Sequence, residues 1–121
     1  MSEPLVVVTP SGPVHTLALN RPAALNSFTG ALHAELLAAL EAAAANPAVR
    51  CVVLTGTGRA FCAGQDLADP AVAPDLTPGA APKDLGAVID TLYGPLCQRI
   101  RSMPVPVVAA VNGVAAGAGA N

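Results

Sequence analysis

The sequence predicts an α/β fold made of repeated strand–strand–helix units, and three observations support this. Residues 1–54 follow the order strand, strand, helix, strand. The apolar runs 51–54 and 105–111 do not alternate with polar residues, which is typical of strands buried on both faces. Each run leads into a loop of small residues, at 60–67 and at 112–119.

The N-terminal unit begins with two expected strands, at 5–8 and 14–19, joined by a Pro- and Gly-containing turn at 10–13. A helix is expected next, because apolar residues recur at helical spacing. These residues are Leu32, Leu36, Leu40 and Ala43. Side-chain oxygens for the helix N-cap are available at 26–29, and Asn46 with Pro47 ends the helix. The chain then returns as a strand over 48–54.

The second unit contains a long irregular segment. Residues 68–83 are rich in proline and alanine and show no period, so we expect a mobile loop. Asp84 is placed to cap a second helix with an apolar stripe. The stripe consists of Leu85, Ile89, Leu92, Leu96 and Ile100. Gly94 and Pro95 predict a kink within this helix.

Length and composition limit the function. A chain of 121 residues holds one domain at most. Charged residues make up 12%, too few to cover a small isolated domain, so we expect part of the surface to lie against more protein. The net charge of −2 argues against nucleic acid as a partner.

Cellular location and metal binding are judged from the termini, the apolar stretches and the cysteines. The first residues lack a basic segment followed by an apolar one, so no signal peptide is expected. Residues 105–120 are too short and glycine-rich to span a bilayer, and we expect neither membrane contact nor export from the cytoplasm. Cys51, Cys62 and Cys97 are widely spaced, which favours neither a disulfide framework nor a metal site.

The two small-residue loops are the candidate site. Loops of Ala, Cys and Gly let a ligand approach the backbone closely, and the groups on offer there are N–H donors. Two such loops after two strands suit an anion site built from the backbone. Taken alone, the loops are better explained as tight strand-to-helix connections.

Three motifs in order carry a family resemblance. They read LNRP followed by LNSF at 19–28, RAFCAGQDL at 59–67 and NGVAAGAG at 112–119. The sequence resembles the enoyl-CoA hydratase/isomerase (crotonase) family over all of its residues. Within that family it looks most like the ring-epoxide isomerases of phenylacetate breakdown, the 2-(1,2-epoxy-1,2-dihydrophenyl)acetyl-CoA isomerases.

The resemblance implies an architecture and a substrate. It implies a crotonase-like spiral of ββα units, with residues 1–121 as the N-terminal part of one domain, because family members are longer. It implies an acyl-CoA substrate, with coenzyme A as part of that substrate and no separate cofactor. It also implies a homo-oligomer, a trimer or hexamer.

The resemblance assigns roles residue by residue. The backbone N–H groups of Gln65 and Ala118 are expected to form an oxyanion hole for a thioester enolate. Contacts with the substrate and its coenzyme A are expected around both loops and the N-terminal turn. These contact residues are Arg21, Ala23, Leu25, Ala63, Gln65, Asp66, Leu67 and Gly117.

Asn121 occupies the position where the hydratases carry a glutamate. An amide is no general base at neutral pH, so the resemblance favours an acyl-CoA isomerase over an enoyl-CoA hydratase. The hydratase remains an alternative, as does an incomplete, non-catalytic fragment that binds CoA or a partner. The acid or base of the isomerases lies beyond residue 121 by the same resemblance.

Three further side chains have expected roles. Asp66 is expected to hold the shape of the first loop rather than to act as a base. Cys62 is expected to be a packed, inert thiol, since neither histidine lies near it in sequence. His33 is expected to face solvent or a neighbouring subunit.

Overall fold

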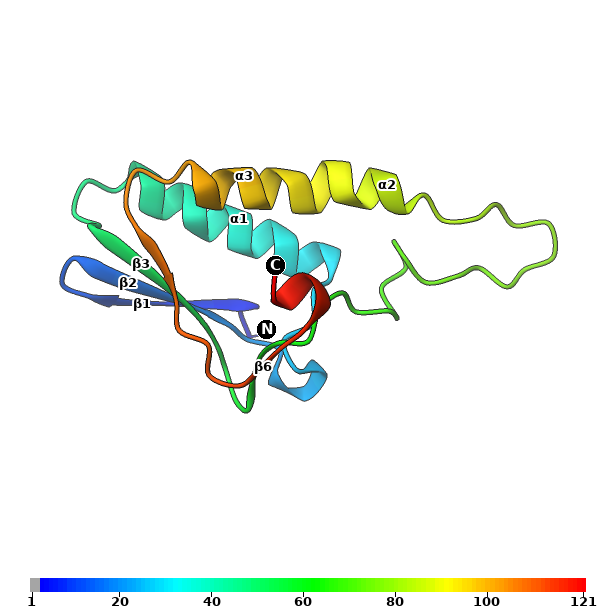
Figure 1. Cartoon of the computed structure of the whole chain (residues 1–121), viewed down its shortest axis with the longest axis horizontal. Helices are drawn as coiled ribbons and strands as arrows, with labels where there is room; N and C mark the ends of the chain where they lie inside the picture. Colours follow the sequence, from blue (N-terminus) through cyan, green and yellow to red (C-terminus); the bar gives the residue numbers. More distant parts are fainter. Residues whose placement is uncertain (1–2) are drawn as a thin grey trace.

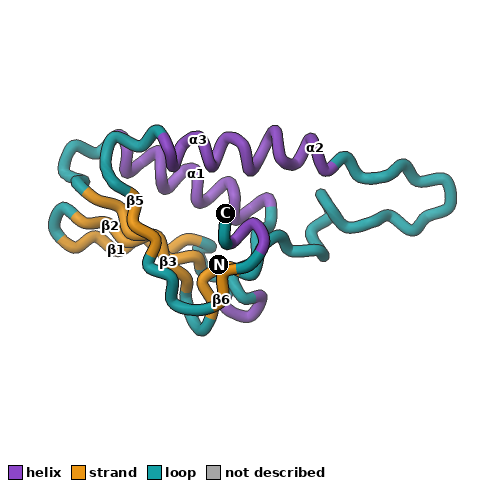
Figure 2. The backbone as a smooth tube through the Cα atoms, viewed as in Figure 1, coloured by secondary structure: helices purple, strands orange, loops and turns teal. Residues whose placement is uncertain are grey.

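A computed structural model describes residues 3–121, and its elements follow the repeating order that the sequence predicts. Two strand–strand–helix units are followed by a third pair of strands and a 3₁₀ turn (Figures 1 and 2). The first contains β1 (Val6–Ser11), β2 (Val14–Leu19), the 3₁₀ turn η1 (Pro22–Ala24) and α1 (Gly30–Ala45). The second contains β3 (Cys51–Gly56), β4 (Ala60–Cys62), α2 (Leu85–Val88), the π-helical turn η2 (Ile89–Tyr93) and α3 (Gly94–Arg101). The third contains β5 (Val107–Ala109), β6 (Val114–Ala115) and the 3₁₀ turn η3 (Gly117–Gly119).

The strands form two sheets. The larger has the order β1-β2-β3-β5, in which β1 and β2 are antiparallel and the other neighbours are parallel. The smaller joins β4 to β6 in parallel. Since β4 follows β3 and β6 follows β5, the second sheet brings the two small-residue loops together.

The core lies between the larger sheet and the helices. Figure 1 shows α1 and α3 side by side over one face of the sheet, and an ion pair of 3.3 Å between Arg99 Nε and Glu41 Oε1 joins them. The apolar stripe of α1 is buried as expected, at Leu32, Leu36, Leu40 and Ala43. Thr29 caps this helix by accepting a hydrogen bond from the Leu32 N–H, and Asn46 ends it.

The expectation that the central strands are buried on both faces is wrong. In β3 only Val52 is fully buried, and Val108 of β5 is half exposed. The helices cover one face of the sheet, and nothing within residues 3–121 covers the other. The strand predicted over 48–54 also begins later, at Cys51, because a turn at 47–48 follows α1.

Two local predictions need correction. The hairpin turn is shorter than expected: β1 continues through Pro10 and Ser11, which an edge strand tolerates because Pro10 need not donate to a ladder. The kink predicted at Gly94 and Pro95 is not seen. The N–H of Gly94 donates instead to Ile89 O, one residue beyond the α-helical pattern, and this π turn lets α2, η2 and α3 run on as one rod (Figure 1).

The irregular segment expected at 68–83 is a loop, and Figure 1 shows it extending away from the body of the molecule. Asp84 ends it by capping α2 through a 3.0 Å bond from the Ala87 N–H. The apolar stripe after it is buried only at Leu96, while Leu85 and Ile89 are exposed. No helix within residues 3–121 combines the length and apolar character that crossing a membrane requires.

Candidate active site

The two small-residue loops lie against each other. The Ala116 N–H donates to Cys62 O over 3.1 Å, directly after the β4–β6 pairing. A Cβ on Gly64 would lie 3.0 Å from Ala116 O and 3.6 Å from the Ala118 nitrogen. The structure therefore brings together two segments that are about fifty residues apart in sequence.

Glycine is required at two of the points where the loops approach each other. Gly64 has a φ of +109°, which residues with a Cβ rarely adopt. A Cβ on Gly119 would collide with the carbonyl of Cys62, a backbone group that cannot move aside like a side chain. The small residues that made these loops conspicuous in the sequence are thus needed for the contact between them.

The Gln65 N–H points away from Phe28, the residue that pairs with the first loop. Phe28 forms a parallel bridge with Gln65: the Phe28 N–H donates to Gly64 O over 2.7 Å, and the Asp66 N–H donates to Phe28 O over 2.8 Å. In this pattern the groups flanking Gln65 face Phe28, while its own N–H faces the opposite side. Among residues 3–121, no protein acceptor takes this N–H.

Ala118 is the matching residue of the second loop. It lies in η3, whose hydrogen bonds come from the neighbouring N–H groups: Gly119 donates to Ala116 O and Ala120 to Gly117 O. The Ala118 N–H has no acceptor in the described part of the chain. Gln65 and Ala118 therefore each offer an N–H that no protein acceptor among the described residues takes, and a pair of such donors suits a developing negative charge.

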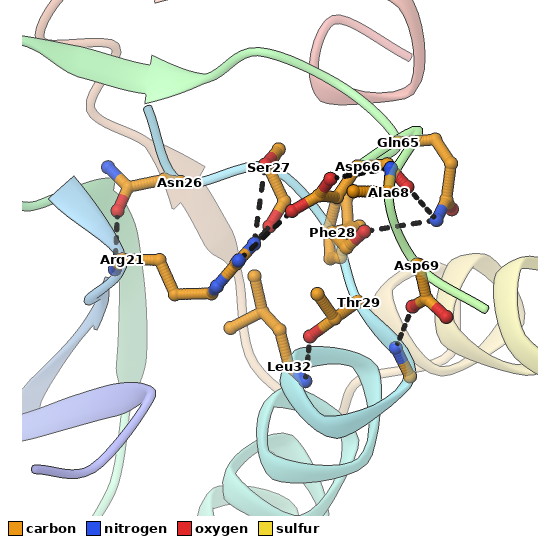
Figure 3. Close-up of polar contacts among 11 residues, drawn as sticks. Arg21, Asn26, Ser27, Phe28, Thr29, Leu32, Gln65, Asp66, Ala68 and Asp69 are labelled. Carbon is orange, nitrogen blue, oxygen red and sulfur yellow. Dashed lines mark hydrogen bonds and ion pairs between the residues drawn. The ribbon is translucent and has the colours of Figure 1, made fainter. Parts of the chain in front are cut away.

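Arg21 and Asp66 link the N-terminal turn to the first loop (Figure 3). Arg21 Nη2 lies 3.0 Å from Asp66 Oδ2, and Nη1 donates to Ser27 O. Asp66 Oδ1 accepts from the Ala68 N–H over 2.9 Å. The hydrogen bond from Ala68, with the Arg21 bond and charge, lowers the pKa of Asp66. A carboxylate held in this way shapes the loop, as expected, and is a weak base.

Sequence reasoning missed two asparagines that hold the loop ends. Asn26 is fully buried at a φ of +57°; its Oδ1 accepts from the Arg21 N–H, and its Nδ2 donates to Thr57 O and Ala60 O. Asn112 Nδ2 donates to Gly58 O and to the same Ala60 O. Both asparagines belong to the recognised motifs, but the motifs do not indicate that they share one carbonyl.

The other predicted site residues differ in exposure: two contact each other inside the site, and the rest are exposed. Leu25 O accepts from the Ala63 N–H over 3.0 Å, so these two lie together. Ala23 in η1 and Gly117 in η3 are exposed, and Leu67 is 78% exposed. Asn121 is exposed and lines the same cavity as Ala118.

The prediction that His33 faces solvent or a neighbouring subunit is wrong. His33 is 3% exposed, and its ring stacks on Phe28 with centroids 4.4 Å apart. Tyr93 contacts it edge-on at 4.2 Å. Desolvation lowers the pKa of His33, with the charge of Asp69 opposing this shift. His33 follows Leu32 on the inner side of α1, so the helical period that marked the leucines also marked this position.

Cys62 is a packed thiol, as expected: it is 1% exposed, and burial raises its pKa. It lines an apolar cavity of about 200 Å³ together with Phe61, Tyr93 and Ala118. The cavity lining contains no charged side chain and no histidine. Residues 3–121 therefore bring no carboxylate and no imidazole to this cavity. They contain no cluster of three potential metal ligands.

Comparison with known proteins decides the family. The model of the enoyl-CoA hydratase/isomerase family matches residues 10–121. The chain belongs to the enoyl-CoA hydratase/isomerase family. A 1,2-epoxyphenylacetyl-CoA isomerase of Escherichia coli is 52% identical over 88% of the chain, and a probable enoyl-CoA hydratase of Rhodobacter capsulatus is 46% identical over 100%. A 2,3-dehydroadipyl-CoA hydratase of Escherichia coli is 40% identical over 98%.

Solved structures of the family share the fold. An enoyl-CoA hydratase of Mycobacterium smegmatis superposes with a TM-score of 0.81 at 34% identity, over 97% of this chain and 43% of that one. The enoyl-CoA hydratase of Bacillus anthracis gives 0.80 at 32% identity, over 95% and 42%. The predicted crotonase-like α/β fold is confirmed. The chain spans 39% of the Escherichia coli isomerase and 40% of the Rhodobacter protein.

Proposed function

We propose that this protein is an acyl-CoA isomerase that stabilises a thioester enolate between the backbone N–H groups of Gln65 and Ala118. The observation that carries the proposal is the contact between the two loops, together with the absence of a protein acceptor for these two N–H groups among residues 3–121. Membership of the enoyl-CoA hydratase/isomerase family supports a CoA thioester as the substrate.

The chemistry follows from the thioester. Moving a proton beside its carbonyl places negative charge on the carbonyl oxygen, and two fixed N–H donors stabilise that charge without reorganising. Loss of one such donor typically costs roughly 10²–10³ in rate. Coenzyme A arrives as part of the substrate, so the proposed reaction uses no separate cofactor.

Isomerisation is favoured over hydration for two reasons. Asn121 stands where the hydratases of the family are expected to carry a glutamate, and its amide cannot take a proton from water. The relative that shares 52% identity over most of the chain is an isomerase by name. By the family resemblance the proposed acid or base lies beyond residue 121, and no carboxylate or histidine among residues 3–121 lines the cavity beside Ala118.

Enoyl-CoA hydration is the second candidate. It is favoured by the Rhodobacter capsulatus relative, a probable hydratase that aligns with every residue of this chain. The similarity to the 2,3-dehydroadipyl-CoA hydratase of Escherichia coli also supports hydration. Both candidates use the same pair of N–H donors and differ in the group that handles the proton.

A direct assay separates the candidates. The full-length gene product is offered crotonyl-CoA, and loss of the conjugated thioester absorbance is followed; in parallel it is offered the ring-epoxide of phenylacetyl-CoA. We expect isomerisation to be faster than hydration by at least about 10²-fold, the usual contribution of a general acid or base. Rapid hydration of crotonyl-CoA would overturn the isomerase assignment.

We also propose that the protein is cytoplasmic and that it assembles as a trimer or hexamer.

A further inference from the structure

The Gln65 side chain is held on two sides although its role in the proposed site belongs to its backbone. Its Oε1 accepts a hydrogen bond of 2.5 Å from the Tyr93 hydroxyl. Its Nε2 donates to Phe28 O over 3.1 Å and to Asp66 O over 3.2 Å (Figure 3 shows the bonds on the Phe28 side). Both amide hydrogens and one lone pair of Oε1 are therefore used inside the protein, so the side chain has no donor left for a ligand.

Tyr93 is itself fixed in place. Its ring contacts Phe28 edge-on with centroids 5.6 Å apart, and it contacts the ring of His33 in the same way. Neither nitrogen of His33 has a hydrogen-bond partner among residues 3–121, so His33 acts here as a packed aromatic ring. Burial raises the pKa of Tyr93 to about 12, and its hydroxyl therefore remains a donor at neutral pH.

The two ends of this hydrogen bond come from different elements. Gln65 lies after β4, and Tyr93 is the last residue of the π turn η2, which follows the long loop 68–83 and α2. A π turn changes the direction of the side chains that follow it, and such turns often occur at functional sites. The Tyr93–Gln65 bond thus ties the first loop to the second helical segment.

We propose that Tyr93 is a positioning residue which, through the Gln65 side chain, fixes the Gln65 peptide so that its N–H points at the substrate carbonyl. The inference rests on the proposed function. Phe28 O holds the peptide from one side through the Asp66 N–H and Gln65 Nε2, and Tyr93 holds the same residue from the side of η2. Small errors in the placement of a catalytic group are costly, up to about 10²-fold for 1 Å.

The test uses Tyr93→Phe in the full-length gene product. This change removes only the hydroxyl and keeps the ring that packs on Phe28 and His33. We expect kcat to fall by about 10-fold, with KM for the acyl-CoA changed less than about twofold. Thr91→Val is the matched control: Thr91 Oγ1 donates to Ala87 O in the same helical segment, is exposed, and has no contact with Gln65. It should leave kcat unchanged.

A spectroscopic measurement separates this inference from the proposed function. Butyryl-CoA with a ¹³C-labelled carbonyl is bound to each variant, and the carbonyl stretching band is recorded by difference infrared spectroscopy. Hydrogen bonds from the hole should lower the band frequency in the unchanged protein, and Tyr93→Phe should reverse most of that shift. No shift in the unchanged protein would refute the hole itself, and the inference with it. A full shift retained in Tyr93→Phe would refute the positioning role alone.

A double-variant comparison tests the route through the side chain. Gln65→Met keeps the length of the side chain but replaces the amide oxygen with a thioether, a far weaker acceptor for the Tyr93 hydroxyl. If Tyr93 acts through Gln65, adding Tyr93→Phe to Gln65→Met should lower kcat no further. Multiplication of the two separate losses in the double variant would overturn the inference, because Tyr93 would then act independently of Gln65.

Discussion

At Gln65 the backbone and the side chain have separable roles. The N–H is available toward the proposed oxyanion, whereas the side-chain amide is used by Tyr93, Phe28 O and Asp66 O. The motif indicated that the backbone of this residue matters. It did not indicate the partners of the side chain, since Tyr93 lies 28 residues further along the chain.

The first prediction follows from this separation. Gln65→Pro removes the N–H and should reduce turnover of the full-length gene product by at least about 10²-fold. Gln65→Ala keeps the N–H and should cost about as much as Tyr93→Phe, clearly less than proline. Steady-state kinetics of both variants give the comparison, with circular dichroism as the control for folding. Equal losses would show that the side chain, rather than the N–H, is the catalytic group.

Two other residues show how partners decide a role. Arg21 was assigned by resemblance to the coenzyme, and the structure shows its guanidinium bound to Asp66 and Ser27 O. The pKa of Asp66 is lowered in turn, and its carboxylate holds the loop by accepting a hydrogen bond from the Ala68 N–H. A sequence reveals that a turn contains an arginine, but the length and direction of its side chain in the fold determine what it binds.

At the scale of elements, the loop 68–83 is the least packed part of the second unit. Leu76 is 88% exposed and Leu67 at its start is 78% exposed, which is unusual for leucine. The loop leads into α2 and then to Tyr93, so it connects the first loop of the site with the residue that holds Gln65.

Binding of the substrate should therefore order this loop. We expect saturating acyl-CoA to slow cleavage within residues 67–85 by thermolysin, a protease that cuts beside exposed leucines, by at least several-fold. Free coenzyme A is the matched control, because it lacks the acyl group that reaches the N–H pair. Mass spectrometry of the fragments locates the cuts. Cleavage at an unchanged rate with bound acyl-CoA would remove the loop from the site.

The π turn shows where element-level reasoning fell short. Pro95 predicted a kink, because proline breaks the regular hydrogen bonding of a helix. The structure shifts the pattern by one residue instead, with the Gly94 N–H bonded to Ile89 O. This wider turn takes the place of the predicted kink.

At the scale of the whole molecule, the burial of His33 should make the free energy of unfolding depend on pH. Burial lowers its pKa in the folded protein, so the unfolded chain binds a proton more readily. Stability is therefore unaffected well above the ordinary histidine pKa of about 6.5 and falls as the pH drops below it, until the pH passes the lowered folded pKa. The slope is at most about 1.4 kcal/mol per pH unit for one group.

Replacing His33 with phenylalanine should flatten this acid dependence while keeping a ring between Phe28 and Tyr93. Urea unfolding at pH 7.5 and at pH 5.5 measures the effect as a difference in free energy of unfolding. His15→Gln is the control, since His15 is only partly buried, in the hairpin strand β2. An acid dependence that survives in His33→Phe would place its origin elsewhere.

The sequence by itself determined the α/β class, the strand–strand–helix order and the two loops, because turn residues, helical spacing and small-residue runs act locally. It also identified the family, since three motifs in order are specific. Only the tertiary structure decided which face of β3 is covered, that His33 is buried, and that Tyr93 reaches Gln65. Those outcomes depend on how α1, η2 and the two sheets pack together, and contacts between distant segments leave no local pattern in the chain.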